Sequence, residues 1–133
     1  MTDRTIRIAI NAEMDIATAI LQAGRMSAEL GFNSADQSRV ATAVSELASN
    51  IVKYAGTGHV LIGPVERSGR RGIEIVAQDQ GPGIEDLDQA MSDHYSSGGT
   101  LGLGLPGVRR MLDDFSVESA PGKGTRVTGR KWR

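Results

Sequence analysis

The sequence predicts an α+β fold, a two-layer sandwich in which helices cover one face of a mixed, mostly antiparallel β-sheet. Segments with the alternating apolar residues of strands come mostly in pairs joined by glycine-rich turns. Two long helical segments follow one another directly. Paired strands and paired helices favour a sheet that packs against helices on one face. At 133 residues, we expect a single domain over residues 1–133.

The composition is that of an ordinary globular protein and argues against several functional classes. The net charge of −1 argues against a nucleic-acid partner held by bulk electrostatics. Cysteine is absent, which excludes disulfides, thiolate metal sites and cysteine nucleophiles. No apolar run approaches the roughly 18 residues of a membrane span, and the start lacks a signal-peptide core. We therefore expect a cytoplasmic protein with no membrane partner.

The first half of the chain is predicted to contain one strand and two helices. Apolar residues alternate over 6–10, which is typical of a strand. An apolar stripe at helical spacing predicts a helix over about 13–30. A second helix is predicted over about 34–55, where Ser34 and Gln37 resemble a capping box.

The second half is predicted to contain mostly strands, with a helix before the last pair. Its serine- and glycine-rich stretch is typical of a mobile loop. The expected elements are strands over 60–67 and 73–79, a short helix over 86–93, a loop over 94–104, a helix over 106–115, and strands over 116–120 and 125–132.

Glu46 and Asn50 form the first candidate site. Residues four apart stack on one helix face about a turn apart, and this face lies beside the predicted apolar stripe. The Asn50 amide oxygen is a suitable ligand for Mg²⁺. The Glu46 carboxylate, next to a metal, could orient or deprotonate an attacking hydroxyl. The spacing alone, however, favours an ordinary solvated helix face.

The segment from Asp79 to Gly83 forms the second candidate site. Asp79 ends a predicted half-buried strand, and Gly81 and Gly83 permit positive φ angles and the close approach of a ligand. A buried carboxylate is costly unless it is hydrogen-bonded, and the exocyclic amine of a base could supply that bond. A tight Asp–Gly turn is the alternative, and the segment by itself favours neither.

Two further glycine-containing segments could contact a ligand. Gly102 and Gly104 lead into a predicted helix, whose N–H groups and positive dipole end would favour phosphate oxygens. A flexible loop before a capped helix is the alternative. Gly124 and Thr125 link the last two predicted strands, either as an ordinary hairpin turn or as a contact to a base bound by Asp79.

Taken together, these motifs resemble the Bergerat-fold (GHKL) ATPases, the group of gyrase, Hsp90, histidine kinases and MutL. The resemblance spans nearly the whole chain and implies the Bergerat fold. The matching residues are Glu46 and Asn50 for the N box, Asp79, Gly81 and Gly83 for the G1 box, Gly102 and Gly104 for the G2 box, and Gly124 and Thr125 for the closing Gly-Thr motif.

Within this group, the chain resembles one subgroup in particular. We expect a stand-alone ATPase module, because the chain shows neither a phosphoacceptor-histidine helix pair nor a transducer domain. The segments 46–51, 79–84, 104–108, 112–116 and 131–133 are similar to the RsbT-type switch kinases of the stressosome. These serine/threonine kinases are related to the anti-sigma factor kinases.

This resemblance implies an ATP- and Mg²⁺-dependent protein serine/threonine kinase. Glu46 would be the catalytic residue that activates the partner's hydroxyl, and Asn50 would hold the metal. Asp79 would receive the adenine amino group, and the lid over 96–104 would close on the triphosphate. The nucleotide-binding residues implied are Asn50, Asp79, Gly81, Gly83, Gly102, Gly104 and Thr125.

The resemblance also implies partners. The substrate would be a STAS-domain protein in a partner-switching stress pathway, and the released kinase would activate a PP2C-type phosphatase. Two alternatives stay open. One is an anti-sigma factor kinase that binds a sigma factor and phosphorylates an anti-anti-sigma protein. The other is a nucleotide-gated binding switch with little catalysis.

Overall fold

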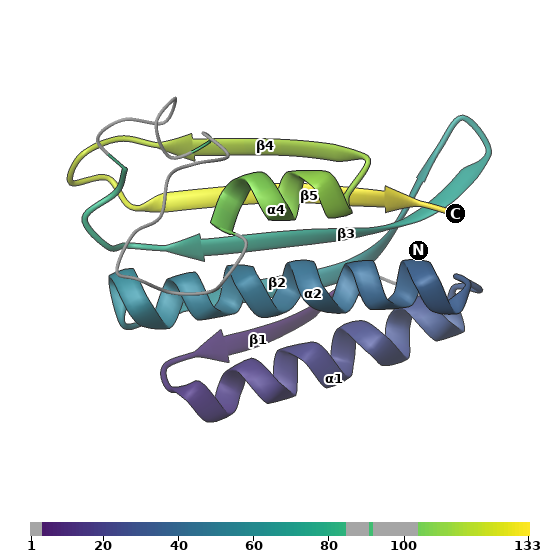
Figure 1. Cartoon of the computed structure of the whole chain (residues 1–133), viewed down its shortest axis with the longest axis horizontal. Helices are drawn as coiled ribbons and strands as arrows, with labels where there is room; N and C mark the ends of the chain where they lie inside the picture. The colour runs from purple at the N-terminus through teal and green to yellow at the C-terminus, as the bar shows by residue number, and fades with distance from the viewer. Residues whose placement is uncertain (1–3, 85–90, 92–103) are drawn as a thin grey trace.

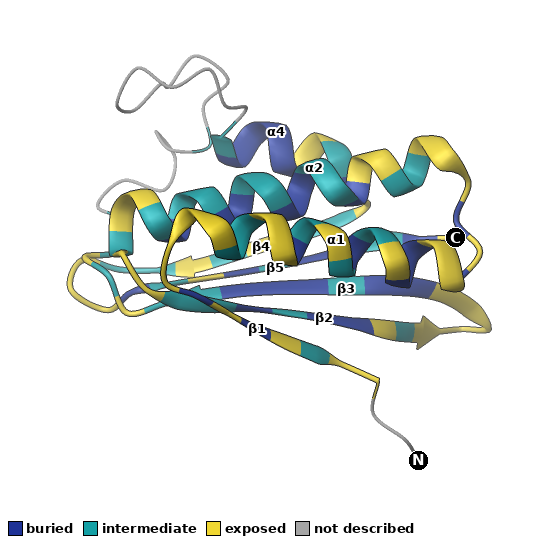
Figure 2. Ribbon diagram, turned by 90° about the horizontal axis from the view of Figure 1, so that it is seen from below, coloured by how far each residue is buried: buried dark blue, intermediate teal, exposed yellow. Residues whose placement is uncertain are grey.

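Helices and a five-stranded sheet form two layers in the computed structural model, which describes residues 4–84, 91 and 104–133 (Figure 1). The strand order is β1-β2-β3-β5-β4, and all four neighbouring pairs are antiparallel. The α-helices cover one face and leave the other open (Figure 2). The predicted α+β sandwich is confirmed, and its described strands form an antiparallel sheet throughout.

The element bounds follow the predicted periodicity closely. They are β1 (Ile6–Ile10), α1 (Glu13–Glu29), α2 (Ser34–Asn50), the π-helical segment η1 (Ile51–Ala55), β2 (Gly58–Arg67), β3 (Arg70–Asp79), α4 (Gly104–Met111), β4 (Asp114–Ser119) and β5 (Thr125–Trp132). Apart from Met91, the short helix expected over 86–93 lies outside the described residues, as does the loop expected over 94–104 up to residue 103.

Helix α2 occupies the centre of the helical layer, between α1 and α4 (Figure 1). Its predicted apolar stripe is buried, with 0% exposure at Val40 and Val44 and 2% at Leu47 and Ile51. The stripe packs on alternate strand residues such as Ile75, which is also fully buried. Burying an aliphatic side chain of this size contributes about 1.5–3 kcal/mol. The polar residues of α2 are therefore held in place by its core contacts.

Several boundaries differ from the sequence prediction, among them the N-terminal cap of α2. The N-cap of α2 is Asn33 and not Ser34, because the Asn33 side chain accepts a 2.8 Å hydrogen bond from the backbone N–H of Asp36. Gln37 does not close a capping box there, since its side-chain amide donates to the Phe32 carbonyl at 2.8 Å. An amide oxygen at the N-cap satisfies a helix donor as well as a hydroxyl does.

Helix α4 begins earlier and ends earlier than the predicted helix over 106–115. The backbone N–H of Asp113 donates to the Arg130 carbonyl at 2.9 Å, and Phe115 pairs with Gly129 in the β4–β5 ladder. Pairing with β5 therefore takes the backbone groups that further helical turns would use. The result is a tight turn from α4 into the edge strand.

Candidate functional site

A row of residues crosses four strands at one end of the sheet. Gly58 pairs with Asp79, Asp79 with Thr125, and Thr125 with Ser119. Register partners project to the same face of a sheet. Asp79 shares its face with Ile75, which is part of the core, so this row faces the helices. Asp79 and Thr125 are half-buried there.

The end of α2 and segment η1 lie on this row. Figure 1 shows the end of α2, the end of β3 and the start of β5 at the same end of the molecule. A Cβ added at Gly58 would lie 2.9 Å from Ile51 Cγ2, and one added at Gly81 would lie 2.7 Å from Ala55 Cβ. The two glycines therefore allow the helical layer to approach the strand ends. A π-helical turn such as η1 is frequent at functional sites.

Glu46 and Asn50 are half-buried on the last turns of α2. Asn50 directly precedes Ile51, which contacts the sheet at Gly58, and Glu46 lies one turn earlier. Within the described part of the chain, neither side chain makes a hydrogen bond or an ion pair. An unengaged carboxylate and amide at the edge of a packed helix are available to a ligand.

Asp79 is fixed by its own turn and still has an oxygen to offer. Its Oδ1 accepts a 2.9 Å hydrogen bond from the backbone N–H of Gly81. This is a tight Asp–Gly turn, and it uses only one of the two carboxylate oxygens, so the turn is compatible with a binding role. Among the described residues, no donor reaches Asp79 Oδ2. That oxygen can accept a hydrogen bond from a ligand.

Gly83 and Gly124 allow two loops to pack backbone to backbone. Their φ angles are +80° and +76°, in the region that L side chains rarely adopt. A Cβ at Gly83 would overlap the Ala120 carbonyl oxygen, and one at Gly124 would overlap the Asp79 carbonyl oxygen. The structure thus provides a packing reason for these two glycines besides room for a ligand.

Ser119 is a residue of the site that the sequence reasoning missed. Its Oγ accepts from the Ile84 N–H at 2.9 Å, donates to the Gly124 carbonyl at 2.8 Å, and lies 2.9 Å from Thr125 Oγ1. Because the single Ser119 proton goes to Gly124, Thr125 is the donor between the two hydroxyls. The Thr125 oxygen then keeps its lone pairs for a ligand. The strands predicted over 116–120 and 125–132 would have placed Ala120 opposite Thr125, whereas the structure pairs Thr125 with Ser119.

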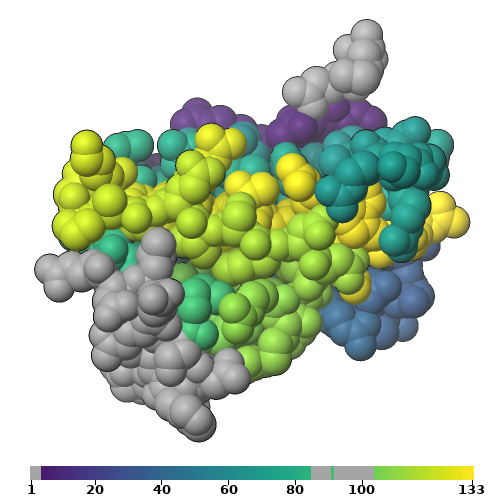
Figure 3. Space-filling view, turned by 90° about the horizontal axis from the view of Figure 1, so that it is seen from above, coloured from purple at the N-terminus to yellow at the C-terminus, as the bar shows by residue number. Residues whose placement is uncertain are grey.

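The glycines of the predicted lid are only partly described. Gly104 begins α4 with a φ of +66°, and Gly102 lies outside the described residues. Helix α4 begins toward the end of the molecule where β3 ends (Figure 1). From the β4 edge, α4 is seen next to β4 (Figure 3).

The structure brings Asp79, Gly81, Gly83 and Thr125 together under the end of α2, beside Asn50.

The described residues offer no ready-made metal cage and no membrane span. Over residues 4–84, 91 and 104–133, no group of three or more His, Cys, Asp or Glu side chains could hold a metal ion. In the same part of the chain, no helix has both the length and the apolar character needed to cross a bilayer.

The fold and this arrangement define a family, and the comparisons agree with them. Residues 35–131 match the family of histidine kinase-, DNA gyrase B- and HSP90-like ATPases, and the chain belongs to this family. The serine/threonine-protein kinase RsbT of Bacillus subtilis (strain 168) is 46% identical over 125 residues, which is 94% of each chain. This similarity confirms the expected serine/threonine-protein kinase.

A further relative and two solved structures are also similar to this chain. The anti-sigma F factor of Clostridium kluyveri is 34% identical over 96 residues, covering 69% of this chain and 68% of that protein. The crystal structure of the RsbU and RsbW domains of Rv1364c from Mycobacterium tuberculosis matches with a TM-score of 0.65 at 16% identity. That match covers all of this chain and 33% of the other. The mycobacterial sensor histidine kinase MprB matches with a TM-score of 0.52 at 19% identity, over 98% of this chain and 97% of the other.

Proposed function

We propose that this kinase transfers the γ-phosphoryl group of ATP to a serine or threonine of a STAS-domain protein in a partner-switching stress pathway. The observation that carries the nucleotide site is the Asp79–Thr125 pair under the end of α2, with an acceptor oxygen of each side chain available. The similarity to RsbT over most of both chains supports the choice of a protein as the phosphoryl acceptor.

The adenine base would bind between the strand ends and the end of α2. Asp79 Oδ2 would accept a hydrogen bond from the exocyclic amine, since Oδ1 is already used by the Gly81 N–H. Thr125 Oγ1 would accept a second hydrogen bond from the base or from a water molecule. A half-buried carboxylate with such a partner avoids the desolvation cost of an unpaired one.

The triphosphate would extend from the base toward the start of α4. Gly102 and Gly104 would supply backbone N–H contacts, next to the positive end of the helix. Bound Mg²⁺ supplies charge neutralisation across the phosphate oxygens. The half-buried Asn50 amide fits this ion, because Mg²⁺ is usually held by few protein oxygens together with phosphates and water.

Glu46 would act on the incoming hydroxyl. The serine oxygen forms a bond to the γ-phosphorus while the bond to the bridging oxygen of ADP breaks. The hydroxyl proton passes to the Glu46 carboxylate, which has no competing partner among the described residues. Because a carboxylate is a weak base, Glu46 would serve chiefly to orient the nucleophile and to accept its proton late.

The proposal includes the wider pathway. After phosphorylation of its STAS-domain substrate in a stressosome-like complex, the kinase would leave and activate a PP2C-type phosphatase. The cytoplasmic location expected from the sequence is part of this proposal.

The decisive test is phosphoryl transfer from γ-labelled ATP to a STAS-domain protein of the same genome. We expect acid-stable label on the STAS protein, because phosphoserine survives acid and phosphohistidine does not. Glu46→Gln should lose transfer and keep ATP binding. The matched variant Glu66→Gln, at an exposed carboxylate of the β2–β3 hairpin, should keep both. ATP binding without any label transfer would refute the kinase assignment.

An anti-sigma role is the second candidate, because the anti-sigma F factor of Clostridium kluyveri is 34% identical to 69% of this chain. The two roles predict different complexes. A pull-down with the purified chain should retain the STAS protein and not a sigma factor if the proposal is correct. Retention of a sigma factor, with release on STAS addition, would favour the anti-sigma role.

A further inference from the structure

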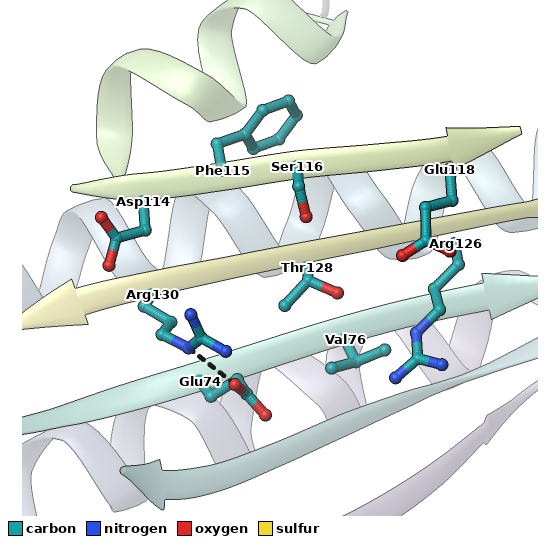
Figure 4. A pocket seen from close by; sticks show the side chains of 9 residues that line it. All are labelled: Glu74, Val76, Asp114, Phe115, Ser116, Glu118, Arg126, Thr128 and Arg130. Carbon is teal, nitrogen blue, oxygen red and sulfur yellow. Dashed lines mark hydrogen bonds and ion pairs between the residues drawn. The ribbon is translucent and has the colours of Figure 1, made fainter. Parts of the chain in front are cut away.

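The face of the sheet that the helices leave open carries a second set of charged side chains. A hollow of about 480 Å³ lies there over β3, β5 and β4, with Val76 and Thr128 on its floor (Figure 4). Glu74 and Arg130 form a 2.7 Å ion pair at one side of it. This face lies on the other side of the sheet from the Asp79–Thr125 pair.

Unlike Arg130, Arg126 forms no ion pair with a described residue. Its register neighbour on β4 is Glu118, so an ion pair between the two is available. No such pair forms, and in Figure 4 the Arg126 guanidinium extends away from Glu118 across β3. It projects toward β2 and leaves both side chains without an ion-pair partner among the described residues.

His59 is the residue on β2 that Arg126 approaches. Both residues pair with Gln78 of β3, so their Cα atoms are about 10 Å apart, within the reach of an arginine side chain. From the other side, Arg7 Nη2 lies 3.5 Å from His59 Nδ1. Burial, then Arg7 and then Arg126 lower the pKa of His59. Two guanidinium groups thus converge on one half-buried imidazole.

Among the described residues, no ion pair joins Arg7 or Arg126 to an acidic side chain, so both guanidinium groups are available to an anion. Both arginines are exposed, so water screens much of their mutual repulsion, and Glu118 neighbours Arg126 in register without pairing to it. Because a guanidinium has no acceptor, Arg7 must donate to Nδ1, and the imidazole proton then sits on Nε2. All three side chains therefore present donors.

We propose that Arg7, His59 and Arg126 form an oxyanion site on the open face of the sheet, and that its ligand is a phosphate group. One guanidinium fork already occupies both oxygens of a carboxylate, whereas a phosphate group has enough oxygens to accept from two forks and an imidazole. The site is separate from the nucleotide site and does not depend on the proposed kinase reaction. Its phosphate could be inorganic phosphate or the phosphate of a phosphoserine side chain.

His59 provides a direct readout by NMR titration of its imidazole. The chain has two histidines, so a His94→Gln background leaves the His59 signals alone. The charged groups near His59 are Arg7 from β1, Arg126 from β5 and, beyond it, Glu118 from β4. Strand β3 contributes the uncharged Gln78. A bound dianion must raise the pKa of His59, because it favours the imidazolium.

The test compares sodium phosphate with sodium chloride and sodium acetate at equal ionic strength. Phosphate should raise the pKa of His59 above its value in either other salt. Arg7→Gln and Arg126→Gln should each raise that pKa in chloride, because a nearby positive charge is gone. Each should also weaken phosphate binding about tenfold, because a charge-assisted bond is lost. Arg71→Gln, which removes an exposed arginine of the β2–β3 hairpin, should change neither the pKa of His59 nor phosphate binding.

Each other outcome overturns the site. No rise beyond that in chloride would mean that phosphate does not bind there. An equal rise of the His59 pKa in acetate would contradict a phosphate site. Equal weakening of phosphate binding by Arg71→Gln would indicate a nonspecific effect of net positive charge. Titration with a phosphoserine peptide separates the two sources. Tighter binding than inorganic phosphate assigns the site to a modified protein, and equal or weaker binding assigns it to the free ion.

Discussion

Asp79 and Thr125 are register partners in the β3–β5 ladder, and both side chains lie on the face of the sheet that the helices cover. Each has an acceptor oxygen that no described residue uses. The pair comes from strands β3 and β5, which are separated in sequence by elements that include α4 and β4. A substitution at either position should therefore change ligand binding more than it changes the fold.

Asp79→Asn should weaken ATP binding about 10- to 100-fold, the loss expected for a hydrogen bond to a charged acceptor. The asparagine oxygen can still accept from the Gly81 N–H, so the turn should survive. Isothermal titration calorimetry measures the affinity, and Glu66→Gln is the matched loss of an exposed carboxylate. An unchanged ATP affinity would contradict the assignment of Asp79.

Ser119→Ala should weaken ATP binding by a smaller factor, about 3- to 10-fold, because Thr125 would lose the partner that directs its proton. The KM for ATP should rise while kcat changes little, since Ser119 would act through Thr125 at the base end of the nucleotide. Ser116→Ala removes an exposed serine from the same strand and should change neither value. An equal effect of both variants would indicate a general loss of stability.

Gly83→Ala should destabilise the protein by at least about 2 kcal/mol, because it combines a strained φ with a backbone overlap. Gly69→Ala separates the two costs. Its φ is +78°, and an added Cβ meets nothing within 4 Å, so only the strain of about 1 kcal/mol is expected. Chemical unfolding of both variants measures the difference. Equal losses would show that loop packing at Gly83 is unimportant.

Gly24→Ala should stabilise the protein by about 0.5–1 kcal/mol, since alanine favours a helix interior over glycine. An added Cβ at Gly24 meets nothing within 4 Å. Gly31→Ala is the contrasting change, because Gly31 has a φ of +87° and should lose stability. Thermal denaturation should therefore shift in opposite directions for the two variants.

Asp114 should make the folded protein less stable at acidic pH. The hydrogen bond from Trp132 Nε1, at 2.8 Å, is the largest cause that lowers the pKa of Asp114, and Arg67 adds a 2.9 Å ion pair. Since the folded pKa lies below the ordinary value of 3.8, the stabilisation is present above that pH. It is lost as the pH falls through the folded pKa.

Thermal melts of Asp114→Asn across pH measure this contribution. At pH 7 the variant should melt below the unmodified protein, and the two should converge as the pH falls below about 4. Glu118→Gln, on the same strand and without an ion pair among the described residues, should follow the unmodified protein. A constant difference at every pH would assign the loss to packing rather than to charge.

Sequence periodicity predicted the strands and helices well, because burial acts on every second residue of a strand and on one stripe of a helix. The stripe from Val40 to Ile51 is an example. Prediction failed where a local signal competed with a distant one. The helix expected to reach residue 115 stops at Met111, because Asp113 and Phe115 find partners on β5.

The candidate site, too, was predictable only in part. The sequence alone determined the kinds of groups that were available: a carboxylate and an amide one turn apart, an Asp–Gly turn, and glycines before a helix. It also carried the family motifs. Only the tertiary structure decided that Asp79 faces Thr125, that Ser119 directs the Thr125 hydroxyl, and that Gly83 and Gly124 are required by neighbouring backbone. These relations depend on strand register between distant segments, and register is set by packing of the whole sheet against α2.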